Sequence, residues 1–153
     1  FSPGRDTVLL PATMPLGAAI CFEVVFPGLV TSQVRSGAEL LVTLTNDGWY
    51  GFSWAPEQHF AQVRVRAAEV GRWYARAALT GISGFITPQG RVAARLPVGE
   101  RGILIHNLES WRGLTPRVRW GDWWAILCAA ATVLLLLVGR DGGRLTARKR
   151  SKV

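Results

Sequence analysis

Hydrophobic and polar positions in the first part of the chain predict strands and helices in turn. An apolar run at residues 18–20 and a near-continuous apolar run at 39–45 are typical of buried strands, the second one buried on both faces. Between them, residues 27–36 can form a short helix that starts at Pro27 and stops before Gly37. This order predicts a right-handed parallel βαβ unit, whose strand ends open at one edge of the sheet.

The clearest helical pattern lies at residues 56–74. Its apolar positions are three or four residues apart and predict a stripe against the sheet: Phe60, Val63, Ala67, Val70 and Tyr74. Charged residues accompany the stripe, and we expect them to form a solvent-exposed face: Arg64, Arg66, Glu69, Arg72 and Arg76. The pattern that follows predicts a strand at 75–80, a hairpin that joins 84–87 to 91–93, and a short strand at 102–106.

An uncharged apolar run occupies residues 123–138. With its flanks it reaches about 20 residues, which is enough for one transmembrane helix. Trp120, Trp123 and Trp124 are typical of an interfacial belt. Three arginines precede the run and six cations follow it, so the positive-inside rule predicts a cytoplasmic tail. The alternative is a helix buried in a protein core.

The charge distribution changes how the net charge of +8 is interpreted. Six cations lie after Gly139, offset there only by Asp141, and this pattern favours a membrane flank over a nucleic-acid site. Both lysines, Lys149 and Lys152, belong to this tail, so residues 1–139 offer no catalytic lysine. The two cysteines are far apart and predict neither a disulfide framework nor a metal cluster. We expect no metal and no cofactor.

Cys21 is the main candidate for chemistry. It follows the first predicted strand and precedes the helix that starts at Pro27. Ligands of open α/β sheets bind at the carboxyl ends of strands, and a helix N-terminus favours a thiolate. Glu23 would flank the thiol if the strand continued, because positions two apart point to the same side of an extended chain. The alternative is that Cys21 is a small buried hydrophobic residue.

The loop at residues 45–54 and His59 are further candidates. Asn46, Asp47 and Gly48 are turn formers, and four aromatic residues follow within the loop. We expect these rings to line a pocket or to contact an apolar partner, since leaving them in water is costly. Alternatively, they cap the core. His59 could partner a cysteine nucleophile, although most histidines in such positions do no chemistry.

Together these segments resemble the apolipoprotein N-acyltransferases, membrane members of the nitrilase (carbon-nitrogen hydrolase) superfamily. The resemblance rests on five segments: residues 19–27 around Cys21, the Asn-Asp-Gly-Trp loop within 44–51, 59–60, 64–69 and 87–90. It implies an α/β fold, the C-terminal part of a nitrilase-like αββα sandwich followed by one transmembrane helix. The implied domains are a catalytic part at 1–118, a transmembrane helix at 119–139 and a basic cytoplasmic tail at 140–153.

The resemblance also implies the chemistry. Cys21 matches the cysteine of a Glu-Lys-Cys triad, and Glu23 matches a residue that acts beside it. Phe22 stands where the family has a tyrosine, Asn46 lies in the matching substrate-binding loop, and Trp49 could gate lipid entry there. The Glu and Lys of the triad lie upstream in the family. Because the sequence starts with Phe1 and not Met, we expect a fragment that is inactive alone.

The implied reaction moves a fatty acyl chain from a phospholipid, through a Cys21 thioester, to the N-terminal amine of the diacylglyceryl-cysteine of an apolipoprotein. The implied partners are these two substrates and the lipid bilayer, without nucleic acid. The implied location is the bacterial inner membrane, with the catalytic domain on its outer face. Two alternatives remain: a nitrilase-type amidase that hydrolyses a small amide, and an inactive membrane-anchored binding module.

Overall fold

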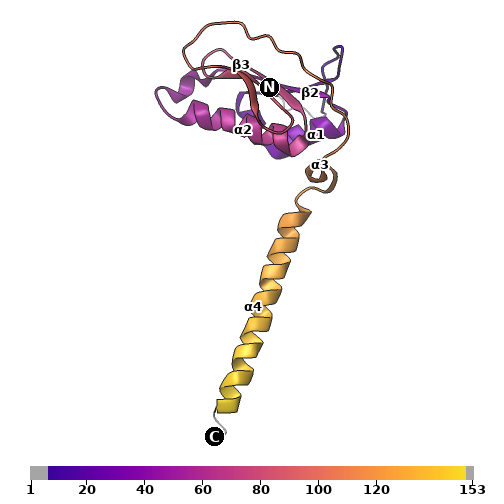
Figure 1. Cartoon of the computed structure of the whole chain (residues 1–153), viewed down its shortest axis with the longest axis vertical. Coiled ribbons are helices and arrows are strands. Elements are labelled where there is room, and N and C mark those ends of the chain that lie inside the picture. Colours follow the sequence, from indigo (N-terminus) through magenta and orange to yellow (C-terminus); the bar gives the residue numbers. More distant parts are fainter. Residues whose placement is uncertain (1–6, 151–153) are drawn as a thin grey trace, which may run out of the picture. The chain divides into compact units, whose positions relative to one another are not determined.

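The computed structural model describes the backbone of residues 7–150 and the side chains of residues 7–138. The chain divides into two units, Phe1–Arg119 and Trp120–Val153. The first unit is built on a five-stranded sheet in which strands follow one another in sequence order (Figure 1). The strands are β1 (Leu16–Ile20), β2 (Leu40–Thr45), β3 (Trp73–Ala78), β4 (Ser83–Ile86) and β5 (Val92–Leu96).

The first three strands of the sheet are parallel and the last two pairings are antiparallel. Helix α1 (Pro27–Arg35) connects β1 to β2, with Pro27 at its first position and Gly37 in a positive-φ conformation beyond its end. The predicted parallel βαβ unit is therefore confirmed. The hairpin of β4 and β5 is confirmed as well, and its turn is closed by the hydrogen bond from Gly90 N to Thr87 O.

Helices α1 and α2 (Ala55–Val70) cover the same face of the sheet (Figure 1). Alternate strand positions on that face, such as Leu41 and Tyr74, are fully buried. The predicted stripe of α2 packs onto them, since Phe60 and Val63 are also buried. This layer of apolar side chains forms the core. It holds β1 and β2 so that both strands end at the same edge of the sheet, the carboxyl edge.

The opposite face of the sheet carries no helix among residues 7–119. Ile20 and Leu44 point to this face and are 55% and 52% exposed, so the expectation that β2 is buried on both faces was wrong. The predicted strand at 102–106 is also wrong: this described segment has no regular structure. Its His106 ring lies 5.6 Å from the Phe85 ring and 5.4 Å from the Trp73 ring, a structural contact.

Helix α2 is shorter than predicted because of a glycine. Gly71 adopts a left-handed conformation (φ 63°, ψ 47°), and its N–H bonds to Ala67 O at 2.9 Å. This is a common way for a helix to end, because glycine has no Cβ to oppose positive φ. The chain then enters β3 at Trp73. Tyr74 is buried as expected, but it belongs to the strand and not to the helix.

Arg64 is exposed as predicted, but three other arginines of this region were wrongly predicted to be solvent-exposed. Arg66, Arg72 and Arg76 are 7%, 4% and 3% exposed. Arg66 makes an ion pair with Glu69, one turn along the helix, at 2.7 Å. Arg72 instead donates to backbone carbonyls, including those of Ala38 and Gly113 at 2.8 Å each. Loop carbonyls that are distant in the sequence therefore supply the acceptors that solvent was expected to supply.

The short helix α3 (Pro116–Trp120) leads to the second unit, which consists of helix α4 (Trp123–Arg150). In its described side chains the Trp123 and Trp124 rings stack at 4.1 Å, and the apolar side chains of 133–138 are more than half exposed. No helix within the described residues meets the length and hydropathy needed to cross a bilayer. The side chains of the predicted basic tail, 140–153, lie outside the described residues.

Candidate active site

Cys21 lies at the turn where β1 ends and a 3₁₀ helix, η1 (Cys21–Val25), begins. Its φ is 52°, and it is the one non-glycine residue with positive φ among residues 7–150. Such a conformation costs about 1–3 kcal/mol in a non-glycine residue and persists only where surrounding contacts hold it. The Cys21 thiol is free and half-buried. The predicted position of Cys21 at a strand end is confirmed.

Glu23 does not flank the thiol in the way an extended chain would place it. The strand stops at Ile20, and the 3₁₀ turn brings the Glu23 carboxylate back to the strand end, where Oε2 accepts the Ile20 N–H at 2.7 Å. The condition for the same-side placement of Glu23, a strand that continues to residue 23, is therefore not met. Its exposed carboxylate still lies within the turn that carries Cys21.

Asp47 occupies the equivalent position at the end of β2, at the start of the 3₁₀ helix η2 (Asp47–Tyr50). Its backbone N–H donates to Thr80 O at 2.7 Å, and its Oδ1 accepts the Thr45 hydroxyl at 2.9 Å. Gly81 leaves room for the carboxylate, since a Cβ there would lie 2.5 Å from Oδ2. Asp47 is only 2% exposed, so this carboxylate needs buried partners.

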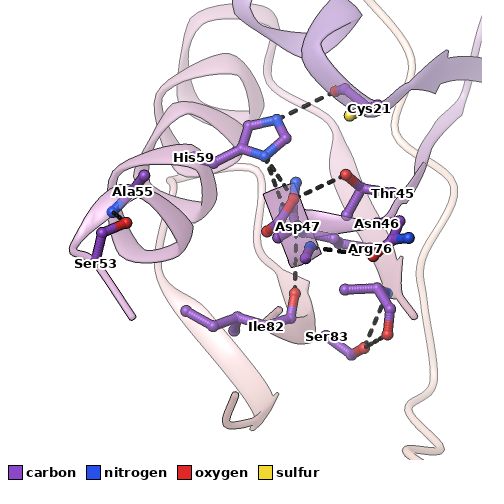
Figure 2. A network of polar contacts seen from close by, with 12 residues as sticks. Cys21, Thr45, Asn46, Asp47, Ser53, Ala55, His59, Arg76, Ile82 and Ser83 are labelled. Carbon is purple, nitrogen blue, oxygen red and sulfur yellow. Dashed lines mark hydrogen bonds and ion pairs between the residues drawn. The ribbon is translucent and has the colours of Figure 1, made fainter. Parts of the chain in front are cut away.

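His59 from α2 and Arg76 from β3 are those partners (Figure 2). His59 Nδ1 lies 2.9 Å from Asp47 Oδ1, and Arg76 Nη2 lies 2.7 Å from Asp47 Oδ2. Arg76 Nε donates to Ile82 O at 3.0 Å. On its other side, His59 Nε2 lies 3.2 Å from the backbone oxygen of Cys21. A buried chain of polar contacts thus joins β3, β2 and α2 to the cysteine turn.

Burial and neighbouring charges shift the pKa values of two groups in this cluster, Arg76 and Tyr50. Burial lowers the pKa of Arg76, while the charges of Asp47 and of a Cys21 thiolate act in the opposite direction and keep the guanidinium charged. Burial, followed by the negative charges of Asp47 and Cys21, raises the pKa of Tyr50, so its hydroxyl stays neutral. The cluster therefore holds a charged Arg76 paired with Asp47, beside a neutral Tyr50.

A pocket of about 280 Å³ opens beside the turn. Phe22, Tyr50 and His59 line it together with Gln58 from α2. The Tyr50 ring meets the His59 ring edge-on at 5.9 Å. Phe22, a predicted substrate-binding residue, is 53% exposed and offers an apolar wall without a hydroxyl. The pocket can therefore take an apolar group beside Phe22, the residue after Cys21.

The aromatic loop after Asp47 does not cap the core. Trp49 is 89% exposed and Trp54 79% exposed, and Phe52 is fully exposed. Phe52 and Trp54 line a second pocket, of about 400 Å³. The exposed Asn46, also a predicted substrate-binding residue, closes the turn by accepting the Gly48 N–H at 3.1 Å. Neither Asn46 nor Trp49 shares a described contact with Cys21.

The sequence-based prediction found Cys21 and missed the cluster behind it. Asp47 was predicted only as a turn former, and Arg76 only as a surface charge. The available signal was the placement of Asp47 two residues after the end of a strand, since polar residues at that edge gather around a site. Within the described residues, no group of three potential ligands could hold a metal ion.

A cysteine held at the carboxyl edge of a mixed sheet, above a buried Asp-His-Arg cluster, defines an α/β protein with a candidate site at that edge. The sequence profile of the carbon-nitrogen hydrolases matches residues 1–114, and the chain belongs to that family. Among its relatives is the apolipoprotein N-acyltransferase of Methylococcus capsulatus, 44% identical over 82% of this chain and 25% of the relative.

A second apolipoprotein N-acyltransferase, from Thermotoga maritima, is 34% identical over 94% of this chain and 29% of the relative. The chain thus spans about a quarter of the length of such relatives. Solved structures show the fold. Saccharomyces cerevisiae Nit3, of the nitrilase superfamily, aligns with a TM-score of 0.53 at 21% identity, over 65% of this chain and 40% of that one.

A variant of the amidase from Nesterenkonia sp. AN1 aligns with a TM-score of 0.52 at 25% identity, over 64% of this chain and 40% of that one. In that amidase, the acetamide moiety of fluoroacetamide is covalently added at the active-site cysteine. These likenesses confirm the nitrilase-superfamily part of the predicted fold.

Proposed function

We propose that this chain carries the nucleophile of a bacterial apolipoprotein N-acyltransferase, with Cys21 as the residue that becomes acylated. The observation that carries this proposal is the positive φ of Cys21 at the end of β1, above the buried cluster of Asp47, His59 and Arg76. A cysteine in a strained backbone conformation destabilises the fold unless surrounding groups hold it, and such residues are typical of functional sites. The names of the sequence relatives supply the substrate class.

The proposed reaction has two steps that use the same sulfur. The Cys21 thiolate attacks the ester carbonyl of a phospholipid, a C–S bond replaces the C–O bond, and the lysophospholipid leaves as an alcohol after it takes up a proton. The N-terminal amine of the diacylglyceryl-cysteine of an apolipoprotein then attacks the thioester. A C–N bond forms, the C–S bond breaks, the amine loses a proton, and the thiolate is restored. Covalent catalysis thereby divides one difficult transfer into two easier ones.

The groups that move protons in these steps belong partly to sequence outside this chain. We propose that an upstream Glu acts as the base and an upstream Lys stabilises developing negative charge, as the family resemblance implies. Residues 1–139 contain no lysine, which is consistent with this division. Glu23 uses one oxygen to hold the turn, and its second oxygen is proposed to orient the incoming amine. Alone, the chain is expected to be inactive.

The lipid substrates call for apolar surfaces near Cys21, and several are present. Phe22 lines the pocket beside the turn, while Trp49 lies exposed on the loop after Asn46. We propose that Phe22, Asn46 and Trp49 contact substrate, with Trp49 at the entrance for lipid.

The exposed apolar side chains of 133–138 support a further proposal, that residues 119–139 span the membrane with the tail in the cytoplasm.

The test is covalent trapping of the first step in the full-length protein. Incubation with phospholipid and without apolipoprotein is expected to leave an acyl group on the Cys21 peptide, seen as a mass shift that neutral hydroxylamine removes. Cys21→Ser is expected to lose turnover, because a serine hydroxyl has a far higher pKa than a thiol. Cys128→Ser is the matched control, since Cys128 lies exposed on α4, and it is expected to keep full activity.

Two results would refute this function. Full activity of Cys21→Ala, or an acyl group found only on Cys128, would remove Cys21 from the mechanism. Release of ammonia from small amides without any lipid transfer would instead favour an amidase, the activity of the aligned Nesterenkonia enzyme. Absence of both reactions in the full-length protein would favour a membrane-anchored binding module.

A further inference from the structure

The turn at Cys21 needs a partner that holds its backbone. A left-handed conformation costs an L-residue roughly 1–2 kcal/mol relative to the right-handed one, because Cβ approaches the following carbonyl oxygen. Glycine would avoid that cost, yet the position holds a cysteine with φ 52°. Something outside the local chain must therefore favour this conformation.

The contact that reaches the Cys21 backbone comes from His59. Its Nε2 lies 3.2 Å from the Cys21 oxygen, and its ring is buried, at 3% exposed. A carbonyl oxygen only accepts hydrogen bonds, so Nε2 must carry the proton. Burial also means that water cannot take over this contact easily when the histidine is removed.

The opposite ring nitrogen allows two protonation states. Nδ1 lies 2.9 Å from Asp47 Oδ1, which favours a proton on Nδ1, and 3.2 Å from Arg76 Nη2, which favours a lone pair there. Both states keep the proton on Nε2 and both direct it at the Cys21 oxygen. Nε2 is therefore committed to the backbone and unavailable as a base for the thiol. This excludes the role of cysteine partner for His59 in this conformation.

We propose that His59 is a positioning residue that transmits the rigidity of the Asp47–Arg76 ion pair to the Cys21 carbonyl and so keeps residue 21 in the left-handed conformation that presents its sulfur. The ion pair is a firm support, because both of its side chains are completely buried, with Arg76 on β3 and Asp47 in the turn that follows the neighbouring strand β2. As a statement about catalysis this inference rests on the proposed function. As a statement about backbone conformation it stands on the contacts alone.

The effect of His59 on the backbone conformation of residue 21 is tested by measuring the free energy of unfolding of the full chain in detergent micelles. Cys21→Gly and Cys21→Ala are compared in a Cys128→Ser background, once with His59 and once with His59→Ala. With His59 present, residue 21 stays left-handed, and the glycine variant is expected to be the more stable of the two. Without His59, residue 21 relaxes to negative φ, and the alanine variant gains because glycine loses more entropy on folding.

For each background we divide the unfolding equilibrium constant of the glycine variant by that of the alanine variant. This ratio is expected to differ roughly tenfold between the background with His59 and the background with His59→Ala. An unchanged ratio would overturn the inference, since a histidine that only packs would shift both variants equally. His106→Ala, the other histidine of the chain, is the matched control and is expected to leave the ratio unchanged. If His59→Ala does not fold, His59→Asn replaces it, because its shorter amide reaches the Nδ1 position near Asp47 and not the Cys21 oxygen.

The catalytic part is tested by the rate at which full-length protein forms the Cys21 thioester. Loss of one hydrogen bond predicts a slowing of about fivefold for His59→Asn, with partial rescue by His59→Gln, whose amide reaches the Nε2 position. Equal rates for Asn, Gln and wild type would overturn this part. The two failures are distinguishable: a swing in stability without any thioester in the wild type refutes only the proposed function, whereas thioester formation without a swing refutes only the positioning role.

Discussion

The ion pair between Arg76 and Asp47 offers the sharpest test of how the site is held. Both side chains are 0% exposed, and their nearest charged atoms are 2.7 Å apart. Arg76→Met keeps much of the side-chain volume and removes the charge, which leaves Asp47 with the Thr45 hydroxyl and His59 as side-chain partners. Breaking a buried pair in this way costs about 3–5 kcal/mol, because an uncompensated charge remains in the interior.

The loss also includes the hydrogen bond from Arg76 Nε to Ile82 O. Since a small domain is stable by only about 5–15 kcal/mol, we expect the variant to be marginally folded at room temperature. The measurement is urea unfolding of the full chain in mild detergent, followed by circular dichroism at neutral pH. If the free energy of unfolding falls with urea concentration at the same slope in both proteins, the shift of the midpoint reports stability and not a different unfolded state.

The chain provides a matched control in Arg95. It pairs with Glu57 through side chains that are 38% and 42% exposed, so Arg95→Met is expected to cost only about 0–1 kcal/mol. If Arg76→Met costs no more than Arg95→Met, the buried pair does not stabilise the site and the reasoning is wrong. The double variant with Asp47→Asn is expected to lose less than the sum of the two single changes, because the unpaired carboxylate is then absent.

Two further predictions concern the lipid. Trp49→Ala is expected to change the free energy of unfolding by less than about 0.5 kcal/mol, because Trp49 is 89% exposed, while it lowers transfer from phospholipid; a large loss of stability with unchanged turnover of the folded protein would contradict the proposed entrance role. For topology, a single cysteine placed at Ser151 in a background with both Cys21→Ser and Cys128→Ser is expected to resist a membrane-impermeant thiol reagent in intact cells, and rapid labelling there would contradict a cytoplasmic tail.

The parts of the fold that depend on local pattern could be predicted from the sequence. The buried strands, the proline at the start of α1 and the hairpin around Pro88-Gln89-Gly90 each have a signal within a few residues. The position of Cys21 followed from the same reasoning, as strand ends are where chemistry gathers. The end of α2 was missed because Tyr74 continues the helical spacing across Gly71, and spacing alone does not reveal which of the two dominates.

The burial of the arginines could not be read from spacing for a different reason. Arg64 is exposed and Arg66 buried on the same helix, and only the tertiary surroundings distinguish them. Arg72 finds its acceptors in carbonyls at Ala38 and Gly113, which lie on either side of it in the sequence and far from it.

Arg76 finds a carboxylate in the turn after the neighbouring strand, and that carboxylate is also what orients His59 toward Cys21. A buried cation is stable only where its partners already stand in place, so its burial is a property of the assembled edge and not of its own segment. The same dependence on the assembled fold explains why the sequence pointed to Cys21 but not to the buried cluster of polar side chains behind it. Each of the three buried charged or polar side chains comes from a different element, so the proposed support of the cysteine turn exists only when η2, α2 and β3 have docked.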